Sequence, residues 1–369
     1  MLHRKQYRMA VVSATVMLTA VMTACGMQKD FGSKESMENE TMENETMGIE
    51  TMETTVSESL AVSGEISEQE SQMPETSKTP GAETTVPQSG TSEETAGDQT
   101  ATESIQAAPM QTVEYTDLQQ ITLDPSWEYA DHSKINTGAA VLYRAPEESG
   151  RKDIVIGVNA GHGTTGGSKV KTLCHPDGSA KTTGGSTAAG ATEAAAVSGG
   201  MTFQDGTPER EVTLRMAQIL RDKLLASGYD VLMLRDGEDV QLDNVARTVI
   251  CNNVADCHIA LHWDSGDGKD YDKGCFYISV PEALKSMEPV ASHWQQHDAL
   301  GADLVEGLRG QGITIYGKGT MSIDLTQTSY SAIPSVDMEL GNGYSDHSDA
   351  TLNTLAEGLL SGIQTYFGQ

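Results

Sequence analysis

Basic residues and paired cysteines are scarce in this sequence. Among 369 residues, 24 lysines and arginines stand against 53 aspartates and glutamates, and the formal net charge is −29. Proteins that bind nucleic acid neutralise its phosphates with a basic stripe or patch, and none is present, so the composition excludes nucleic acid as a partner. A glycine-rich loop with the spacing that cradles phosphates is also missing, which argues against a nucleotide-binding site.

The five cysteines form no metal or redox motif. No two of them have the C-x-x-C spacing that is typical of zinc or thiol–disulfide sites. Disulfides do form in exported proteins, but the sequence assigns no partners. The apolar surroundings of Cys251 and Cys275 favour free thiols, and we extend this interpretation to Cys174 and Cys257.

The first 25 residues have the pattern of a lipoprotein signal peptide. Basic residues are followed by an apolar run from Met9 to Met22 and by small residues before Cys25. The run is shorter than the roughly 20 apolar residues that a transmembrane helix needs. The segment Val21–Gly26, V-M-T-A-C-G, resembles the lipobox of bacterial lipoproteins, which implies that Cys25 is lipidated. The protein would then be extracytoplasmic and held by its lipid anchor on the outer face of the cell membrane. An ordinary signal peptide, with Cys25 incidental, is the alternative.

Residues 26–112 are predicted to form a disordered acidic tether. Phe31 is the only aromatic residue of this segment, and acidic residues outnumber basic ones by about six to one. The pentapeptide M-E-N-E-T occurs at Met37–Thr41 and again at Met42–Thr46. High charge with so little apolar surface does not offset the entropy of ordering, so no fold is expected here. A self-repelling tether of this kind lets a folded domain search the space above a membrane.

The folded part is predicted to be a single α/β domain at residues 153–369, preceded by a short structured lead-in at residues 113–152. From Asp153 onward, apolar runs with strand character alternate with segments whose apolar residues recur at helical spacing. This alternation is typical of a mostly parallel, twisted sheet flanked by helices. Strands are predicted at residues 154–158, 229–234, 258–261, 276–280 and 335–339, and helices at residues 212–227, 240–253, 290–309 and 350–366.

Residues 163–208 form a long insertion rich in glycine, alanine, threonine and serine. Loops of this length without secondary structure are uncommon in compact domains and are usually functional or disordered. The insertion begins beside one candidate site residue, His162, and ends beside another, Glu209. We therefore expect it to lie over the site as a mobile rim, and it is also where we would expect a protein activator to bind.

Four candidate site residues lie at strand ends or at the start of the following element, where sites in open α/β sheets form. His162 follows the first predicted strand in N-A-G-H-G, and Glu209 opens a helix in E-R-E-V-T-L. His262 ends a strand in H-I-A-L-H-W, and Glu339 ends the last strand in P-S-V-D-M-E-L-G. Two histidines and one carboxylate are typical of catalytic zinc with a position open for water, and a second carboxylate can act as the base. The spacing alone fits no short metal motif.

The stretch from Asp153 to the C-terminus resembles the zinc-dependent N-acetylmuramoyl-L-alanine amidases of the type-3 family. The marks of that family are an apolar strand running into A-G-H-G, E-K-x-x-x-L opening a helix, a strand ending in S-I-H, and P-x-x-x-x-E near the end. The corresponding segments here are Ala160–Gly163, Glu209–Leu214, Ala260–His262 and Pro334–Glu339. Leu234–Asp236 and Arg247 resemble shorter family features between these four.

The resemblance implies one Zn²⁺ ion held by His162, Glu209 and His262, with Glu339 as the catalytic carboxylate. It also implies that the substrate is bacterial peptidoglycan. The bond cleaved would be the amide between the lactyl group of N-acetylmuramic acid and L-alanine of the stem peptide.

Two departures from the family pattern keep other functions open. Trp263 and Asp264 stand where the family usually has a small residue and asparagine, and the gap between His162 and Glu209 is longer than in short members. A zinc peptidase that cuts within the stem peptide is one alternative, and a non-catalytic cell-wall-binding lipoprotein is the other. The complete ligand set together with Glu339 argues against the second alternative.

A further pair of histidines has metal-like spacing but lacks the residue that would complete the motif. His293 and His297 lie four residues apart on a predicted helix, as in the H-E-x-x-H zinc proteases. The glutamate of that motif is absent, since Trp294 follows His293. We interpret the pair as a solvated or packing face of the helix rather than as a metal site.

Overall fold

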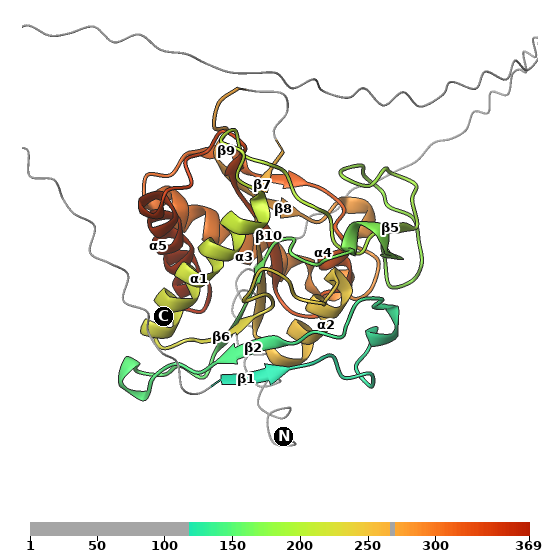
Figure 1. Cartoon of the computed structure of the whole chain (residues 1–369), viewed down its shortest axis with the longest axis horizontal. Coiled ribbons are helices and arrows are strands. Elements are labelled where there is room, and N and C mark those ends of the chain that lie inside the picture. Colours follow the sequence, from blue (N-terminus) through green and yellow to red (C-terminus); the bar gives the residue numbers. More distant parts are fainter. Residues whose placement is uncertain (1–117, 266–269) are drawn as a thin grey trace, which may run out of the picture. The chain divides into compact units, whose positions relative to one another are not determined.

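The structure of the protein is a computed structural model, which describes residues 118–265 and 270–369 (Figure 1). The predicted signal peptide with Cys25 and the predicted tether at residues 26–112 lie outside the described residues. Among the helices within the two described ranges, none is both long and apolar enough to cross a membrane.

A mixed sheet of eight strands runs through the centre of the described part of the chain. Its four inner strands are parallel to one another, and the mostly parallel arrangement confirms the predicted α/β class. The strands next to them on either side run antiparallel to their inner neighbours. From one edge to the other, the strands are β1 (Leu118–Ile121), β2 (Ala140–Tyr143), β6 (Asp230–Met233), β3 (Val155–Ala160), β7 (Cys257–Asp264), β10 (Ser335–Asn342), β8 (Cys275–Ser279) and β9 (Ile315–Ser322).

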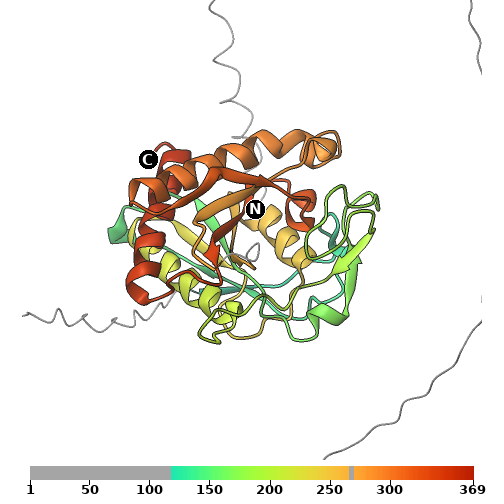
Figure 2. The ribbon, with the colours of Figure 1, turned by 90° about the horizontal axis from the view of Figure 1, so that it is seen from above.

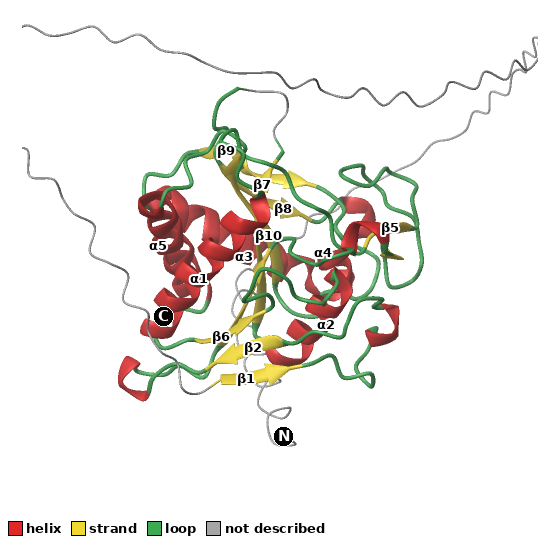
Figure 3. Ribbon diagram, viewed as in Figure 1, coloured by secondary structure: helices red, strands yellow, loops and turns green. Residues whose placement is uncertain are grey.

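Helices cover both faces of this sheet, as the views in Figures 1 and 2 show. One face is covered by α1 (Glu209–Ala226), α3 (Val290–Gly310) and α5 (Asp349–Tyr366), which also pack against one another. The opposite face is covered by the shorter helices α2 (Asn244–Val254) and α4 (Thr326–Tyr330), and Figure 3 separates these helices from the strands between them. Each face of the sheet buries its own apolar cluster against its helices.

All nine predicted elements of the folded part correspond to observed ones, with some shifts at their ends. The helix predicted at residues 240–253 begins at Asn244, because the Asp243 side chain accepts a hydrogen bond from the backbone N–H of Ala246 at 2.8 Å and caps the helix there. Strand β9 and helix α4 were not predicted. In β9, Gly317 and Gly319 interrupt the alternation of side chains from which a strand is recognised.

Two segments contribute more structure than the sequence suggested. The lead-in supplies β1 and β2, which extend the sheet beyond β6. The insertion contains a small antiparallel pair of strands, β4 (Lys171–Leu173) and β5 (Glu193–Ala195). It is therefore not a loop without secondary structure.

Candidate metal centre

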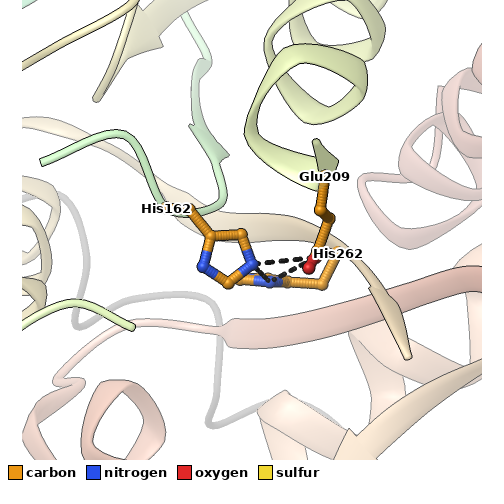
Figure 4. A group of neighbouring side chains, drawn as sticks. All are labelled: His162, Glu209 and His262. Atoms are coloured by element: carbon orange, nitrogen blue, oxygen red, sulfur yellow. Dashed lines mark hydrogen bonds and ion pairs between the residues drawn. The ribbon is translucent and has the colours of Figure 1, made fainter. Parts of the chain in front are cut away.

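Three side chains from three different elements converge at the carboxyl ends of the parallel strands (Figure 4). His162 follows β3, Glu209 is the first residue of α1, and His262 lies near the end of β7. Nε2 of His162 lies 2.9 Å from Oε1 of Glu209, Nδ1 of His262 lies 3.2 Å from the same oxygen, and the two ring nitrogens are 3.1 Å apart. The structure thus brings together the three residues that the sequence predicts as metal ligands.

The turn between β3 and the insertion aims His162 at this point. His162 has a φ of 64°, in the left-handed region that non-glycine residues rarely adopt. The preceding residue has no room for a side chain, because a Cβ on Gly161 would lie 2.4 Å from Cε1 of His262. Nδ1 of His162 lies 3.0 Å from the carbonyl oxygen of Ser198. When Nδ1 donates its proton to that oxygen, Nε2 is the unprotonated nitrogen and faces Glu209 and His262.

Two buried arginines hold the same turn from behind. Arg235 donates hydrogen bonds to the carbonyl oxygens of Ala160 and Gly161, and Arg247 donates to those of Ala160 and His162. Burial lowers the pKa of Arg235 to about 10 and that of Arg247 to about 9, and nearby positive charge contributes in both cases. Both remain charged at neutral pH, so the turn is fixed by charge-assisted hydrogen bonds. In the sequence, both arginines belong to segments that resemble shorter features of the amidase family. The sequence did not indicate that they hold this turn.

Glu209 is held in its ionised form. Its side chain is buried, and its two oxygens accept hydrogen bonds from the backbone N–H groups of Trp263 at 3.0 Å and Met201 at 2.8 Å. Burial alone would raise the pKa of Glu209, but the hydrogen bonds and charges of His162 and His262 outweigh it and hold the pKa well below its usual range. An ionised carboxylate is the form that binds a metal ion.

His262 lies in a strongly negative surrounding. Burial alone would lower its pKa, but the charges of Asp337, Glu209 and Glu339 together raise the pKa to about 10. A proton on the imidazole is therefore stabilised by three carboxylates when no metal is bound. The same negative charge also favours the binding of a metal cation, which displaces this proton from the imidazole.

The donor set fits a tetrahedral metal ion such as zinc. Zinc binds imidazole nitrogen and carboxylate oxygen at about 2.0–2.1 Å, so tetrahedral ligand atoms lie about 3.3 Å from one another. The separations among the three donor atoms, 2.9, 3.1 and 3.2 Å, are close to this value. Two imidazoles and one carboxylate leave one tetrahedral position for water or substrate.

Strand β10 brings two more carboxylates to the site. Glu339 is paired in register with His262, and Asp337 with Ala260, so the two acidic side chains project from the same face of the sheet. Oε2 of Glu339 and Oδ1 of Asp337 are buried without a hydrogen-bond partner. Burial raises the pKa of both carboxyl groups, and the charge of Asp337 raises that of Glu339 further. The sequence singled out Glu339 but not Asp337, although the alternation in D-M-E places both on one face.

The site opens into a cavity of about 700 Å³, of which the insertion forms one wall. Lys171 and Lys181 of the insertion line this cavity together with Asp337 and Glu339. The insertion is tied to the segment between β9 and α4 by the fully buried Asp324, which accepts hydrogen bonds from His175 at 2.9 Å and from the backbone N–H of Thr182 at 2.7 Å. The insertion lies beside the site as predicted. The part of it that contains His175 and Thr182 is anchored by Asp324, whereas the sequence predicted a mobile rim.

The residues at which the sequence departs from the family pattern, Trp263 and Asp264, directly follow His262 on β7. The side chain of Trp263 is almost completely buried, with its ring centroid 5.9 Å from that of Phe203. Asp264 forms an ion pair with Lys273. Both residues also line the cavity.

The remaining histidine and cysteine predictions concern groups outside the metal centre. Nδ1 of the buried His297 accepts a hydrogen bond from the backbone N–H of Ser335 at 2.9 Å, and His293 lies 2.7 Å from the carbonyl oxygen of Pro289. These contacts agree with a packing role for the pair. The four cysteines of the described residues are buried free thiols, namely Cys174, Cys251, Cys257 and Cys275.

Comparison with known proteins identifies the family. Residues 156–363 match the Amidase_3 family, described as N-acetylmuramoyl-L-alanine amidase. Among solved structures, the amidase Ami1 from Mycobacterium smegmatis is 17% identical with a TM-score of 0.49, and the match covers 58% of this chain and 97% of that one. The amidase AmiC2 of Nostoc punctiforme is 17% identical with a TM-score of 0.43, covering 59% of this chain and 99% of that one. No protein with a curated description matches significantly. The family match spans more than half of the chain and includes every candidate ligand, and the chain therefore belongs to the N-acetylmuramoyl-L-alanine amidase family.

Proposed function

We propose that this peptidoglycan amidase is zinc-dependent and that His162, Glu209 and His262 are the ligands of the ion. The observation that carries the proposal is the approach of their three donor atoms to within 3.2 Å of one another in a cavity that also holds the carboxylate of Glu339. The bond hydrolysed is the amide between N-acetylmuramic acid and L-alanine of the stem peptide.

The protein's own residues account for the proton transfers that such a hydrolysis needs. When bound, zinc supplies a Lewis acid that polarises the scissile carbonyl and lowers the pKa of a water molecule to about 7. Glu339 takes a proton from the attacking water and later passes it to the alanine amine as the carbon–nitrogen bond breaks. One carboxylate thus acts first as base and then as acid. The burial that raises the pKa of Glu339 brings it toward the range in which it can do both.

Product analysis tests this function. The purified protein is incubated with zinc and intact peptidoglycan, and the products are identified by mass spectrometry. We expect stem peptides with a free N-terminal L-alanine and glycan strands that keep their lactyl groups. Cleavage within the stem peptide would refute the assignment in favour of a peptidase, and binding without any cleavage would refute it in favour of a wall-binding protein.

We further propose that the protein is an extracytoplasmic lipoprotein, anchored through Cys25 to the outer face of the cell membrane. The basic and apolar segments before Cys25 and the lipobox-like V-M-T-A-C-G support this proposal. Metabolic labelling with a fatty-acid analogue should tag the unaltered protein but not the Cys25→Ser variant. Equal labelling of both would overturn the proposal.

A further inference from the structure

Two of the three proposed ligands have clear partners that fix their orientation. Nδ1 of His162 faces the carbonyl oxygen of Ser198, and the oxygens of Glu209 accept hydrogen bonds from the backbone N–H groups of Trp263 and Met201. Ligating side chains that are held in this way keep their donor atoms directed at the metal. His262 is the ligand whose second ring nitrogen remains to be accounted for.

The second ring nitrogen of His262 faces a carboxylate. Nδ1 of His262 is directed at Glu209 and His162, whereas Nε2 lies 4.0 Å from Oδ2 of Asp337. Asp337 and His262 stand on neighbouring strands, and Asp337 lines the same cavity. Asp337 is 9% exposed, and its other oxygen, Oδ1, is buried without a hydrogen-bond partner. A buried carboxylate in this state costs folding free energy unless something compensates for it.

We propose that Asp337 is a positioning residue that accepts the Nε2 proton of His262 and so directs Nδ1 at the metal. The inference rests on the proposed zinc site, and it adds a residue that does not itself bind the ion.

Metal binding explains why the contact is useful. An imidazole that coordinates through Nδ1 must carry its remaining proton on Nε2, so this nitrogen becomes an obligatory donor. At 4.0 Å the present separation is that of an ion pair rather than of a hydrogen bond. Oδ2 of Asp337 is the carboxylate oxygen that stands on this side of the ring. Loading of the metal therefore favours closure of the pair to hydrogen-bond distance.

A second, weaker role for Asp337 must be distinguished from positioning. In that role Asp337 only adds negative charge to the cavity and does not orient His262. Glu339 provides a matched control, since it lies two residues away on the same face of β10 and also has a buried oxygen without a partner. Glu339→Gln removes one negative charge from the cavity without removing the acceptor that faces Nε2. Asp337→Asn removes the charge but keeps an acceptor oxygen, and Asp337→Ala removes both.

The test is zinc affinity, measured for the full-length chain by competition with a chromophoric chelator. We expect Asp337→Ala to weaken zinc binding by about 10- to 100-fold, and Asp337→Asn and Glu339→Gln to weaken it several-fold less. The visible absorption spectrum of bound cobalt(II), which reports ligand geometry, should change in Asp337→Ala and not in Glu339→Gln.

Two results overturn the proposal. One is unchanged zinc affinity in Asp337→Ala, and the other is a loss no greater than that of Glu339→Gln, since charge alone then explains it. If Asp337→Ala does not fold, Asp337→Leu takes its place, because leucine has nearly the same shape as aspartate but no acceptor oxygen, and an unchanged cobalt spectrum in that variant overturns the proposal. Failure of the unaltered protein to bind zinc would instead refute the proposed metal site, so the two failures are distinguishable.

Discussion

Replacing Glu339 by glutamine is the most direct test of the proposed proton transfers. The substitution keeps the length and shape of the side chain and alters none of the three candidate ligands. Because Oε2 of Glu339 is buried without a hydrogen-bond partner, no protein hydrogen bond through that atom is broken. We therefore expect the fold and the zinc content to be preserved while kcat falls.

The expected loss of kcat follows from the role of Glu339 as general base and general acid. A positioned general base or acid contributes about 10²–10⁴-fold, which corresponds to about 3–5 kcal/mol of transition-state stabilisation. The same carboxylate acts in both proton transfers, and in the described cavity the neighbouring acid Asp337 is directed at His262. We therefore expect a loss near the upper end, about 10⁴-fold in kcat.

The assay measures release of the peptide with a free N-terminal L-alanine from a soluble muramyl peptide, with zinc quantified in the same samples. Asp298→Asn is the matched control, because Oδ1 of Asp298 is also buried without a partner but Asp298 lies on α3 and does not line the cavity. This control should keep the kcat of the unaltered protein. A Glu339→Gln variant that retains more than about a tenth of that kcat, with zinc bound, would refute the assigned role.

Three further changes have defined outcomes. His162→Ala should abolish zinc binding, so elemental analysis should find no zinc where the unaltered chain holds one ion, and retention of zinc would remove His162 from the ligand set. Arg247→Met should destabilise the fold by about 3 kcal/mol in urea unfolding, because the carbonyl oxygen of His162 and the side-chain oxygen of Asn159 both lose their arginine donor; a change below about 1 kcal/mol would contradict this. Burial, together with nearby positive charge, lowers the pKa of His258 and of His297 to about 3. Because both are neutral in the folded protein but protonate near pH 6.5 when unfolded, stability should fall as the pH drops from about 6.5 to 3. The slope should approach about 1.4 kcal/mol per pH unit for each histidine, and His297→Gln should reduce it.

The sequence predicts the inner part of the fold because that part has strong local patterns. Strands β3, β6, β7 and β10 are buried apolar runs, and α1, α3 and α5 have apolar residues at helical spacing. The candidate site residues were predictable in part because the carboxyl ends of parallel strands meet at one edge of a sheet, and the resemblance to the amidase family implied which of them bind the metal. Neither pattern predicts the strands at the two edges of the sheet. Strand β9 is largely exposed and contains two glycines, and β1 is exposed along most of its length, so neither shows the alternation that identifies a strand.

The positioning of the ligands could not be predicted in the same way, because it depends on contacts between segments far apart in the sequence. Arg235 and Arg247 act on backbone carbonyl oxygens of the β3 turn, which are about 75 to 87 residues away in the chain. Every residue has a carbonyl oxygen, so the sequence does not show which of these oxygens accept hydrogen bonds from an arginine. The spacing of Asp337 and Glu339 did place both on one face of a strand, but only the fold shows that Asp337 faces Nε2 of His262.

The insertion contributes contacts to the proposed metal site as well as a wall of the cavity. Its end supplies the carbonyl oxygen that faces Nδ1 of His162 and the N–H group of Met201 that binds Glu209. Gly200 lies between these contacts, and a Cβ there would lie 2.8 Å from Cδ2 of His162 and 3.0 Å from Oε2 of Glu209. A segment with these contacts cannot move away from the cavity as a whole without releasing two of the three proposed ligands. Any movement of the insertion that changes access to the site must therefore leave residues 198–201 in place.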